Sequence, residues 1–454
     1  MTGAGVTSTG VTSTGVTGTG ELTELPPSRW SAYPDTLAGV MPWIGRCLGV
    51  DPASGDEPGA SERTRLPELD AASVVLLLVD GLGERQLAAN AHLAPTLTGL
   101  GGTVLRAGFP STTATSITSL MRGEPASEHG IIGYSFVPDD AARSHGPART
   151  LNMLRWTLDS ADGPSAYDVY PPTTLCSGEA VIGALERSGI RIFQVMPGEF
   201  KDTGFTTVAS GIAGRHLPAK TPAEIRAGIT TALTRTLPRS HRPRVVYAYL
   251  ADLDTAGHIY GPGSDPWCDA LRTVDSLVAD ILADLPSDAR LVVTGDHGML
   301  RAGKTIDLDA EPALSSGVAR VAGEARVRQV YAIDGAVDDV ADTWRDLLGD
   351  DVHIAPREQV LAEHWYGPRA TDHTAARIGD LVVVATDRTV LTRPAVEPGE
   401  SRMLGHHGGW TADELLVPLL IGNDPANHSS SAGSPSTLHS PGSSAKTDVG
   451  THGS

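Results

Sequence analysis

Carboxylate and imidazole side chains recur next to short apolar runs of this sequence, at the points where β-strands would begin or end. Three clusters directly follow such runs, and the fourth, a His-His-Gly-Gly segment, precedes one. Any one of these aspartates could simply cap a following helix, and a histidine pair beside glycine is ordinarily a loop. Four clusters together predict one site on the rim of a sheet. Its side chains are Asp80, Asp254, His258, Asp296, His297 and His407.

Three carboxylates and three imidazoles form a mixed oxygen and nitrogen ligand set. Such sets suit Zn²⁺ or Mn²⁺, whereas all-oxygen sets favour Mg²⁺ or Ca²⁺. Six ligands exceed one tetrahedral site but suffice for two open sites, which can clamp both oxygens of an in-line displacement. We therefore expect two divalent ions, with Zn²⁺ as the first choice and Mn²⁺ as the alternative. The three cysteines, Cys47, Cys176 and Cys268, lie outside the clusters.

A hydroxyl-rich segment supplies candidate nucleophiles. Residues 111–116 read Ser-Thr-Thr-Ala-Thr-Ser and lead into the apolar run Ile117–Met121, which places hydroxyls at the N-terminus of a predicted helix. Free backbone N–H groups and the helix dipole favour an anion there. An ordinary Ser/Thr N-cap is the alternative interpretation. The local pattern does not choose which hydroxyl reacts.

The elements that must position these groups are short apolar runs alternating with helical patterns. The helical pattern at 267–285 has an apolar face and an acidic surface. Near-continuous apolar runs of this length are typical of strands buried on both faces, which indicates a parallel sheet. We predict an α/β fold with a doubly wound, mostly parallel sheet, whose ligands collect at the carboxyl ends of its strands. The main strand candidates are 74–79, 245–250, 291–294, 381–385 and 415–421.

Composition divides the chain into a folded region and two tails. Residues 1–26 contain repeats such as Val-Thr-Ser-Thr-Gly, and residues 424–454 are rich in Ser, Gly and Pro. Both segments are too poor in large apolar side chains to offset the entropy of ordering, so we expect disordered tails. Residues 27–423 are expected to form one catalytic domain, in which about 301–400 is an inserted α+β subdomain.

Charge and cysteine usage restrict the partners. The 454 residues carry a formal net charge of −19, which opposes binding to nucleic-acid polymers or anionic membranes. No run approaches the roughly 20 apolar residues needed to span a bilayer, and residues 1–30 lack a secretory signal pattern. Three widely spaced cysteines fit a reduced compartment, so a cytoplasmic location is expected. The oligomeric state stays open.

An ordered set of motifs resembles the type I phosphodiesterase/nucleotide pyrophosphatase branch of the alkaline phosphatase superfamily. The resemblance implies that Thr113 is the nucleophile. It also implies one metal on Asp80, Asp296, His297 and the Thr113 oxygen, and another on Asp254, His258 and His407. The motifs span about 330 residues: VDG at 79–81, FPSTT at 109–113, EHGIIG at 128–133, LDTAGH at 253–258, GDHGM at 295–299 and GHHGG at 405–409.

The same resemblance limits the substrate. Nucleotide-cleaving relatives continue the nucleophile motif with Phe-Pro-Asn, whose Asn donates to a phosphoryl oxygen; here Ala114-Thr115-Ser116 follows, and Ser116 is the candidate replacement donor. The expected activity is hydrolysis of phosphodiester or nucleotide pyrophosphate bonds in a small phosphate ester through a Thr113 phosphoryl-enzyme. A phosphomonoesterase or phosphonate hydrolase with the same machinery is the alternative. A noncatalytic metal-binding protein is a further one.

Overall fold

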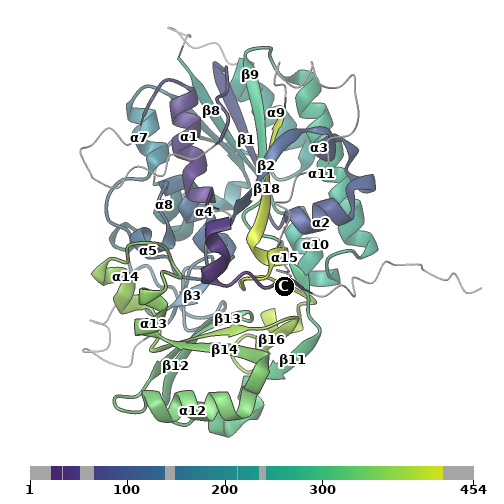
Figure 1. Ribbon diagram of the computed structural model, residues 1–454. Helices are drawn as coiled ribbons and strands as arrows, with labels where there is room; N and C mark the ends of the chain where they lie inside the picture. Colours follow the sequence, from purple (N-terminus) through teal and green to yellow (C-terminus); the bar gives the residue numbers. More distant parts are fainter. Residues whose placement is uncertain are drawn as a thin grey trace, which may run out of the picture.

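The computed structural model describes residues 22–32, 34–51, 66–138, 149–211, 213–234 and 242–422. Most of the two predicted tails, 1–21 and 424–454, lies outside these residues. Within the predicted N-terminal tail, Glu24 forms a β-bridge with Thr411 and Leu25 is buried, so the folded part begins before the expected boundary at 27. Figure 1 shows a large sheet flanked by helices and a smaller subdomain beneath it.

A seven-stranded sheet forms the centre of the larger region. Six of its strands run parallel, and β18 runs antiparallel to both neighbours. The predicted mostly parallel α/β sheet is therefore confirmed. In spatial order the strands are β2 (Gly101–Arg106), β18 (Leu416–Gly422), β9 (Ala289–Thr294), β1 (Ser73–Val79), β8 (Arg244–Leu250), β6 (Arg191–Met196) and β7 (Arg215–Pro218).

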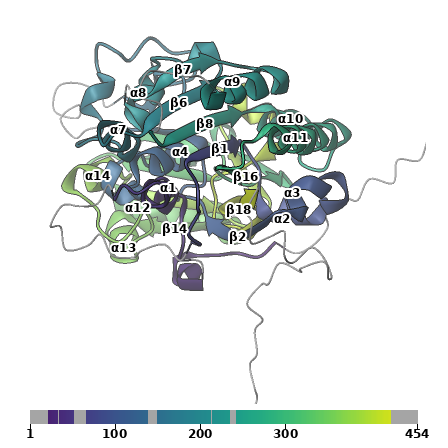
Figure 2. The same ribbon diagram turned by 90° about the horizontal axis from the view of Figure 1, so that it is seen from above.

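Helices cover both faces of this sheet because its central strands are apolar on both sides. Val74, Leu76 and Leu78 face one core, whereas Val75 and Leu77 face the other. Figure 2 shows the resulting layers from above. Helices of the first face are α1 (Val40–Cys47), α4 (Thr113–Arg122), α7 (Val181–Arg187) and α8 (Gly204–Ser210). Those of the second are α2 (Glu84–Ala89), α3 (Pro95–Gly99), α9 (Pro222–Thr234), α10 (Asp252–Tyr260) and α11 (Asp265–Asp284).

The smaller region is a four-stranded antiparallel sheet formed by residues between β9 and β18. Its strands, in spatial order, are β12 (Val318–Glu324), β13 (Val327–Ala332), β15 (Leu381–Ala385) and β14 (Val352–Pro356). The expected strand at 381–385 is β15 of this sheet, within the segment expected to form an inserted α+β subdomain. Helix α12 (Val337–Leu348) packs Val340 and Trp344 on its core, and α13 (Arg357–Ala362) and α14 (Asp372–Arg377) lie beside it.

Short elements connect the two regions. These are the pairs β10 (Leu300–Arg301) with β17 (Gly405–His406) and β11 (Lys304–Asp307) with β16 (Thr389–Thr392), the three-stranded sheet β3 (Ser135–Phe136), β4 (Leu151–Asn152) and β5 (Thr157–Leu158), and helices α5 (Ala126–His129) and α15 (Ala412–Leu415). Within the described part of the chain, every helix is too short or too polar to cross a bilayer.

Candidate active site

Five of the six predicted ligands come from the carboxyl ends of parallel strands. Asp80 is the residue after β1, and Asp296 and His297 come just after β9. Asp254 and His258 lie one turn apart on α10, which begins two residues beyond β8. Because β1 is hydrogen-bonded between β8 and β9, these three strand ends are neighbours on one rim of the sheet.

The sixth ligand, His407, reaches the same rim because β18 runs antiparallel. Residues that precede an antiparallel strand lie at the carboxyl ends of its parallel neighbours. The loop that holds His407 is pinned to the hydroxyl-rich segment, since Ser111 N donates to Gly408 O at 3.0 Å and Ser111 Oγ donates to Gly409 O at 2.7 Å. The structure thus brings all six predicted side chains together.

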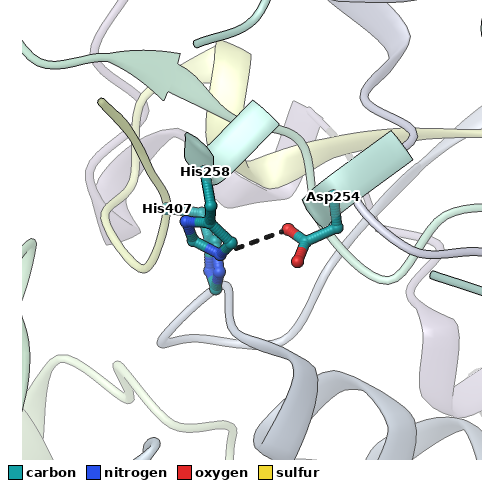
Figure 3. A group of neighbouring side chains, drawn as sticks. All are labelled: Asp254, His258 and His407. Carbon is teal, nitrogen blue, oxygen red and sulfur yellow. Dashed lines mark ion pairs between the residues drawn. The ribbon is translucent and has the colours of Figure 1, made fainter. Parts of the chain in front are cut away.

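Two overlapping groups of possible metal ligands result. Asp254, His258 and His407 form one, and Asp80, Asp254 and His297 form the other. Figure 3 shows the first group, in which His258 Nε2 lies 3.4 Å from Asp254 Oδ1. In the second, His297 Nε2 lies 3.4 Å from Asp80 Oδ1, and Asp296 Oδ2 lies 3.5 Å from the same nitrogen.

All three histidines are held in one tautomer. The Nδ1 atoms of His258, His297 and His407 lie 2.8, 3.0 and 3.0 Å from the backbone carbonyl oxygens of Gly405, Gly298 and Ser111, respectively. A carbonyl oxygen only accepts, so Nδ1 carries the hydrogen and each neutral ring keeps a lone pair on Nε2. Burial, with help from the neighbouring imidazoles, lowers the pKa of His407 well below its usual value, which keeps this ring neutral. Orientation through Nδ1 is typical of metal-binding histidines.

One oxygen of each carboxylate in the site is buried without a hydrogen-bond partner among the described residues. Asp80 Oδ1, Asp254 Oδ1 and Asp296 Oδ2 are shielded from solvent and have no hydrogen-bond partner among the described residues. Burial, reinforced by Asp296 and Asp254, raises the pKa of Asp80 well above its usual value. Burial also raises the pKa of Asp296. Orphaned carboxylate oxygens beside imidazole lone pairs fit divalent cations, which would supply the missing positive charge.

Thr113 lies at the centre of this arrangement. It is the first residue of the ten-residue helix α4, and its Oγ1 lies 3.2 Å from His297 Nε2. Thr112 is the N-cap but its side chain makes no capping hydrogen bond, so the first N–H groups of α4 are not consumed by that side chain. The structure does not bring Ser116 into the cavity: its side chain is fully buried, and its Oγ lies near Gly108.

A glycine lets the two carboxylate-bearing segments approach each other. Gly81 has a φ of +74°, and a Cβ atom at this position would lie 3.0 Å from Cα of Asp254. Its backbone N–H also donates to Asp296 Oδ1 at 3.1 Å. Only glycine combines this backbone conformation with so close a contact.

A cavity of about 510 Å³ opens beside Thr113, Asp80, Asp254, His258 and His407. It is also lined by residues that the sequence reading missed. Among these, the Tyr249 hydroxyl donates a short hydrogen bond to Asp80 Oδ2, and the partly buried Glu324 comes from the smaller region. No motif marks Glu324, whereas Tyr249 sits in the apolar run before Asp254.

Comparison with known proteins agrees with this geometry. Residues 74–410 match the model of the family described as type I phosphodiesterase/nucleotide pyrophosphatase. Mouse ectonucleotide pyrophosphatase/phosphodiesterase family member 3 is 25% identical over 281 residues, which cover 58% of this chain but only 28% of that protein. The chain therefore spans less than a third of this curated relative.

Solved structures show the same fold. Murine ectonucleotide pyrophosphatase/phosphodiesterase 5, an inactive form in complex with AMP, superposes with a TM-score of 0.58 at 18% identity, over 77% of this chain and 87% of that one. Phosphonoacetate hydrolase from Sinorhizobium meliloti in complex with phosphonoacetate gives a TM-score of 0.55 at 19% identity, over 80% and 92%.

The family model covers well over half of the chain and includes every motif from Asp80 to His407. Hydrolysis of the phosphodiesterase and nucleotide pyrophosphatase type is the activity of this family, and metal dependence is typical of it. The chain belongs to the type I phosphodiesterase/nucleotide pyrophosphatase family of the alkaline phosphatase superfamily.

Proposed function

We propose that this protein hydrolyses phosphodiester or nucleotide pyrophosphate bonds of small substrates through a phosphoryl intermediate on Thr113. The observation that carries the proposal is the position of Thr113 Oγ1, which lies 3.2 Å from His297 Nε2 among carboxylates without cation partners. A hydroxyl that only capped a helix would not need this setting.

Two divalent ions are part of the proposal. Asp80, Asp296, His297 and the Thr113 oxygen would hold one, and Asp254, His258 and His407 would hold the other. The orphaned carboxylate oxygens and the three Nε2 lone pairs support both sets. Zn²⁺ is the preferred ion because the donors mix oxygen with imidazole nitrogen, and Mn²⁺ is the alternative.

When bound, divalent cations lower the pKa of an attacking hydroxyl and offset negative charge on phosphate oxygens. The protein's own groups orient the reactants. The N-terminus of α4 directs its dipole and free N–H groups toward a bound anion, and Ser111 fixes the nucleophile segment to the His407 loop. The closed side of the cavity is formed by buried side chains such as Tyr247.

The reaction has two displacements. Thr113 Oγ1 loses its proton and bonds to phosphorus while the bond from phosphorus to the leaving oxygen breaks, and that oxygen takes up a proton and departs as an alcohol or phosphate. Water then attacks phosphorus and the bond to Oγ1 breaks. The second step releases a phosphate monoester and restores the Thr113 hydroxyl.

The relatives support this substrate class. The murine ectonucleotide pyrophosphatase/phosphodiesterase 5 structure holds AMP, a phosphate monoester of the kind that such a reaction releases. The phosphonoacetate hydrolase structure holds phosphonoacetate, which makes a phosphonate the alternative substrate.

A panel of p-nitrophenyl esters and phosphonoacetate tests the proposal, with released p-nitrophenol or phosphate as the readout. Bis(p-nitrophenyl) phosphate, a p-nitrophenyl nucleotide ester, p-nitrophenyl phosphate and phosphonoacetate would be assayed after chelation and after return of Zn²⁺, Mn²⁺ or Mg²⁺. Chelation should abolish turnover, Zn²⁺ or Mn²⁺ should restore it, and elemental analysis should find about two ions per chain. Full activity after chelation, with no more than one ion bound, would contradict the two-metal site.

A further inference from the structure

The lining of the active-site cavity divides into two chemically different parts. One part, beside Thr113, is mostly apolar and comes from the main sheet and its helices; it includes Ile117, Met121, Met196, Phe205 and Ala209. The other part, here called the acidic wall, consists of Tyr134, Glu324, Glu397 and Glu400.

Glu324 places the acidic wall directly beside the reacting groups. It is the last residue of β12, so the smaller region contributes it. A Cβ atom on Gly408, the residue after His407, would lie 2.8 Å from Glu324 Cγ, and Thr112, the residue before the proposed nucleophile, lines the same cavity. Glu324 therefore lies against the backbone next to a proposed metal ligand, in the cavity that also contains the proposed nucleophile.

The other two carboxylates of the acidic wall differ in their partners. Arg328 pairs with both oxygens of Glu397 at 3.0 and 2.7 Å, which neutralises that carboxylate. Glu400 accepts only the Tyr134 hydroxyl, at 3.0 Å, and forms no ion pair with the described residues. Among the described residues that line the cavity, Arg155 is the only arginine or lysine.

One carboxyl oxygen of Glu324 lacks a hydrogen-bond partner among the described residues. Its Oε2 accepts a hydrogen bond from Tyr134 N at 3.0 Å, but its Oε1 is shielded from solvent and has no partner within the described chain. Burial raises the pKa of Glu324 to about 8, so an ammonium group at Oε1 would offset the cost of ionising this carboxyl. A donor or a positive charge from a ligand would satisfy Oε1, whereas a second anion would oppose Glu400 across the same wall.

We propose that the acidic wall makes the enzyme select phosphodiesters whose ester group at the wall carries an ammonium donor, and reject those with a further anionic group there. The proposal rests on the proposed function, because it assigns specificity within that active site. The enzyme should therefore prefer diesters of amino alcohols to nucleotide pyrophosphates and to carboxylated phosphonates. The last two substrate classes add negative charge beside the reacting phosphorus.

Matched diesters test this selectivity. Three phosphate diesters would share one p-nitrophenyl ester and differ in the second ester group, which would be aminoethyl, ethyl or carboxymethyl. For the metal-loaded enzyme, kcat/KM for the aminoethyl diester should exceed that for the carboxymethyl diester at least tenfold. A ratio within twofold would overturn the proposal, even where all three diesters are hydrolysed.

Binding separates this proposal from the proposed function. Affinities of the same diesters for metal-loaded Thr113→Ala, measured by calorimetry, need no turnover. A tenfold higher affinity for the aminoethyl than for the carboxymethyl diester, with no turnover by the wild-type enzyme, would support selection by the acidic wall and contradict the proposed hydrolysis. Equal affinities for the diesters, with normal turnover by the wild-type enzyme, would contradict selection by the acidic wall and support the proposed hydrolysis.

Single substitutions show whether the wall is responsible. Glu324→Gln and Glu400→Gln keep side-chain size, and each should reduce the aminoethyl to carboxymethyl ratio at least threefold. Glu358→Gln, an exposed residue of the smaller region outside the cavity, is the matched charge control and should leave the ratio unchanged. A preference that survives Glu324→Gln and Glu400→Gln together would show that other groups cause it.

Discussion

Two groups of acidic side chains in this molecule differ in whether an arginine neutralises them. At the junction between the two regions, Arg326 donates to both oxygens of Glu414 at 2.9 and 3.0 Å, with both side chains fully buried. Within the smaller region, Arg328 donates in the same way to both oxygens of the partly buried Glu397. At the rim of the main sheet, three carboxylates converge without an arginine or lysine among their described partners.

The difference separates a structural from a functional use of charge. A buried carboxylate costs several kcal/mol unless a cation or hydrogen bonds compensate it. The junction meets that cost within the chain, through the Arg326–Glu414 pair. The rim leaves one oxygen of each carboxylate without a partner among the described residues, which indicates that a bound ligand completes the site.

Replacement of Thr113 should give the largest effect on the rim. Thr113→Ala deletes the attacking oxygen but leaves all six side-chain ligands, so kcat should fall by about three orders of magnitude or more. Metal content and melting temperature should stay near the wild-type values. Thr112→Ala is the neighbouring control, and its cost should be at most about 1 kcal/mol of stability. Near-normal kcat in Thr113→Ala would refute the assignment of the nucleophile.

The junction should respond in stability. Glu414→Gln leaves the Arg326 guanidinium buried without its charge partner, and we expect a loss of about 3 kcal/mol in the free energy of unfolding. Urea denaturation measures this loss. Asp342→Asn breaks the exposed pair with Arg345 and serves as the control, which should unfold like wild type. Equal midpoints for both variants would show that the junction pair is not structural.

A smaller effect of opposite sign is expected at the rim in metal-free protein. The folded-state pKa of Asp80 is raised, so its ionised form opposes folding once the pH exceeds its unfolded value near 4. Asp80→Asn should therefore stabilise metal-free protein by about 1 kcal/mol at pH 7. This gain should shrink as the pH falls toward 4. With metal bound, Asp80→Asn should instead melt at a lower temperature than wild type. A metal-free Asp80→Asn variant less stable than metal-free wild type would contradict the view that the Asp80 charge opposes folding.

The sequence predicts the rim well because each ligand is close in sequence to a recognisable strand. Asp80 and Asp296 follow apolar runs that became β1 and β9. The apolar run at 415–421 indicates a strand but not its direction, and only the antiparallel direction of β18 places His407 at the rim. Direction depends on long-range pairing, which local periodicity does not encode.

Other features depend on contacts that no local pattern records. Ser116 is one helical turn from Thr113, yet helix packing turns its hydroxyl away from the cavity. Glu324 belongs to a strand of the smaller region and reaches the cavity only because the junction docks that region beside His407. The run at 381–385 has the composition of a main-sheet strand but pairs with β13 and β14. Apolar composition predicts burial without choosing the sheet.

The most direct test of the account is to locate the phosphoryl group during turnover. Metal-loaded enzyme would be mixed with excess bis(p-nitrophenyl) phosphate and quenched in acid within the first turnovers, and its peptides would be examined by mass spectrometry. The account predicts an added aryl phosphoryl group on the peptide that contains Thr113, located at Thr113 itself and absent from Thr113→Ala. A phosphoryl group on another residue, or rapid turnover without any modified peptide, would contradict it.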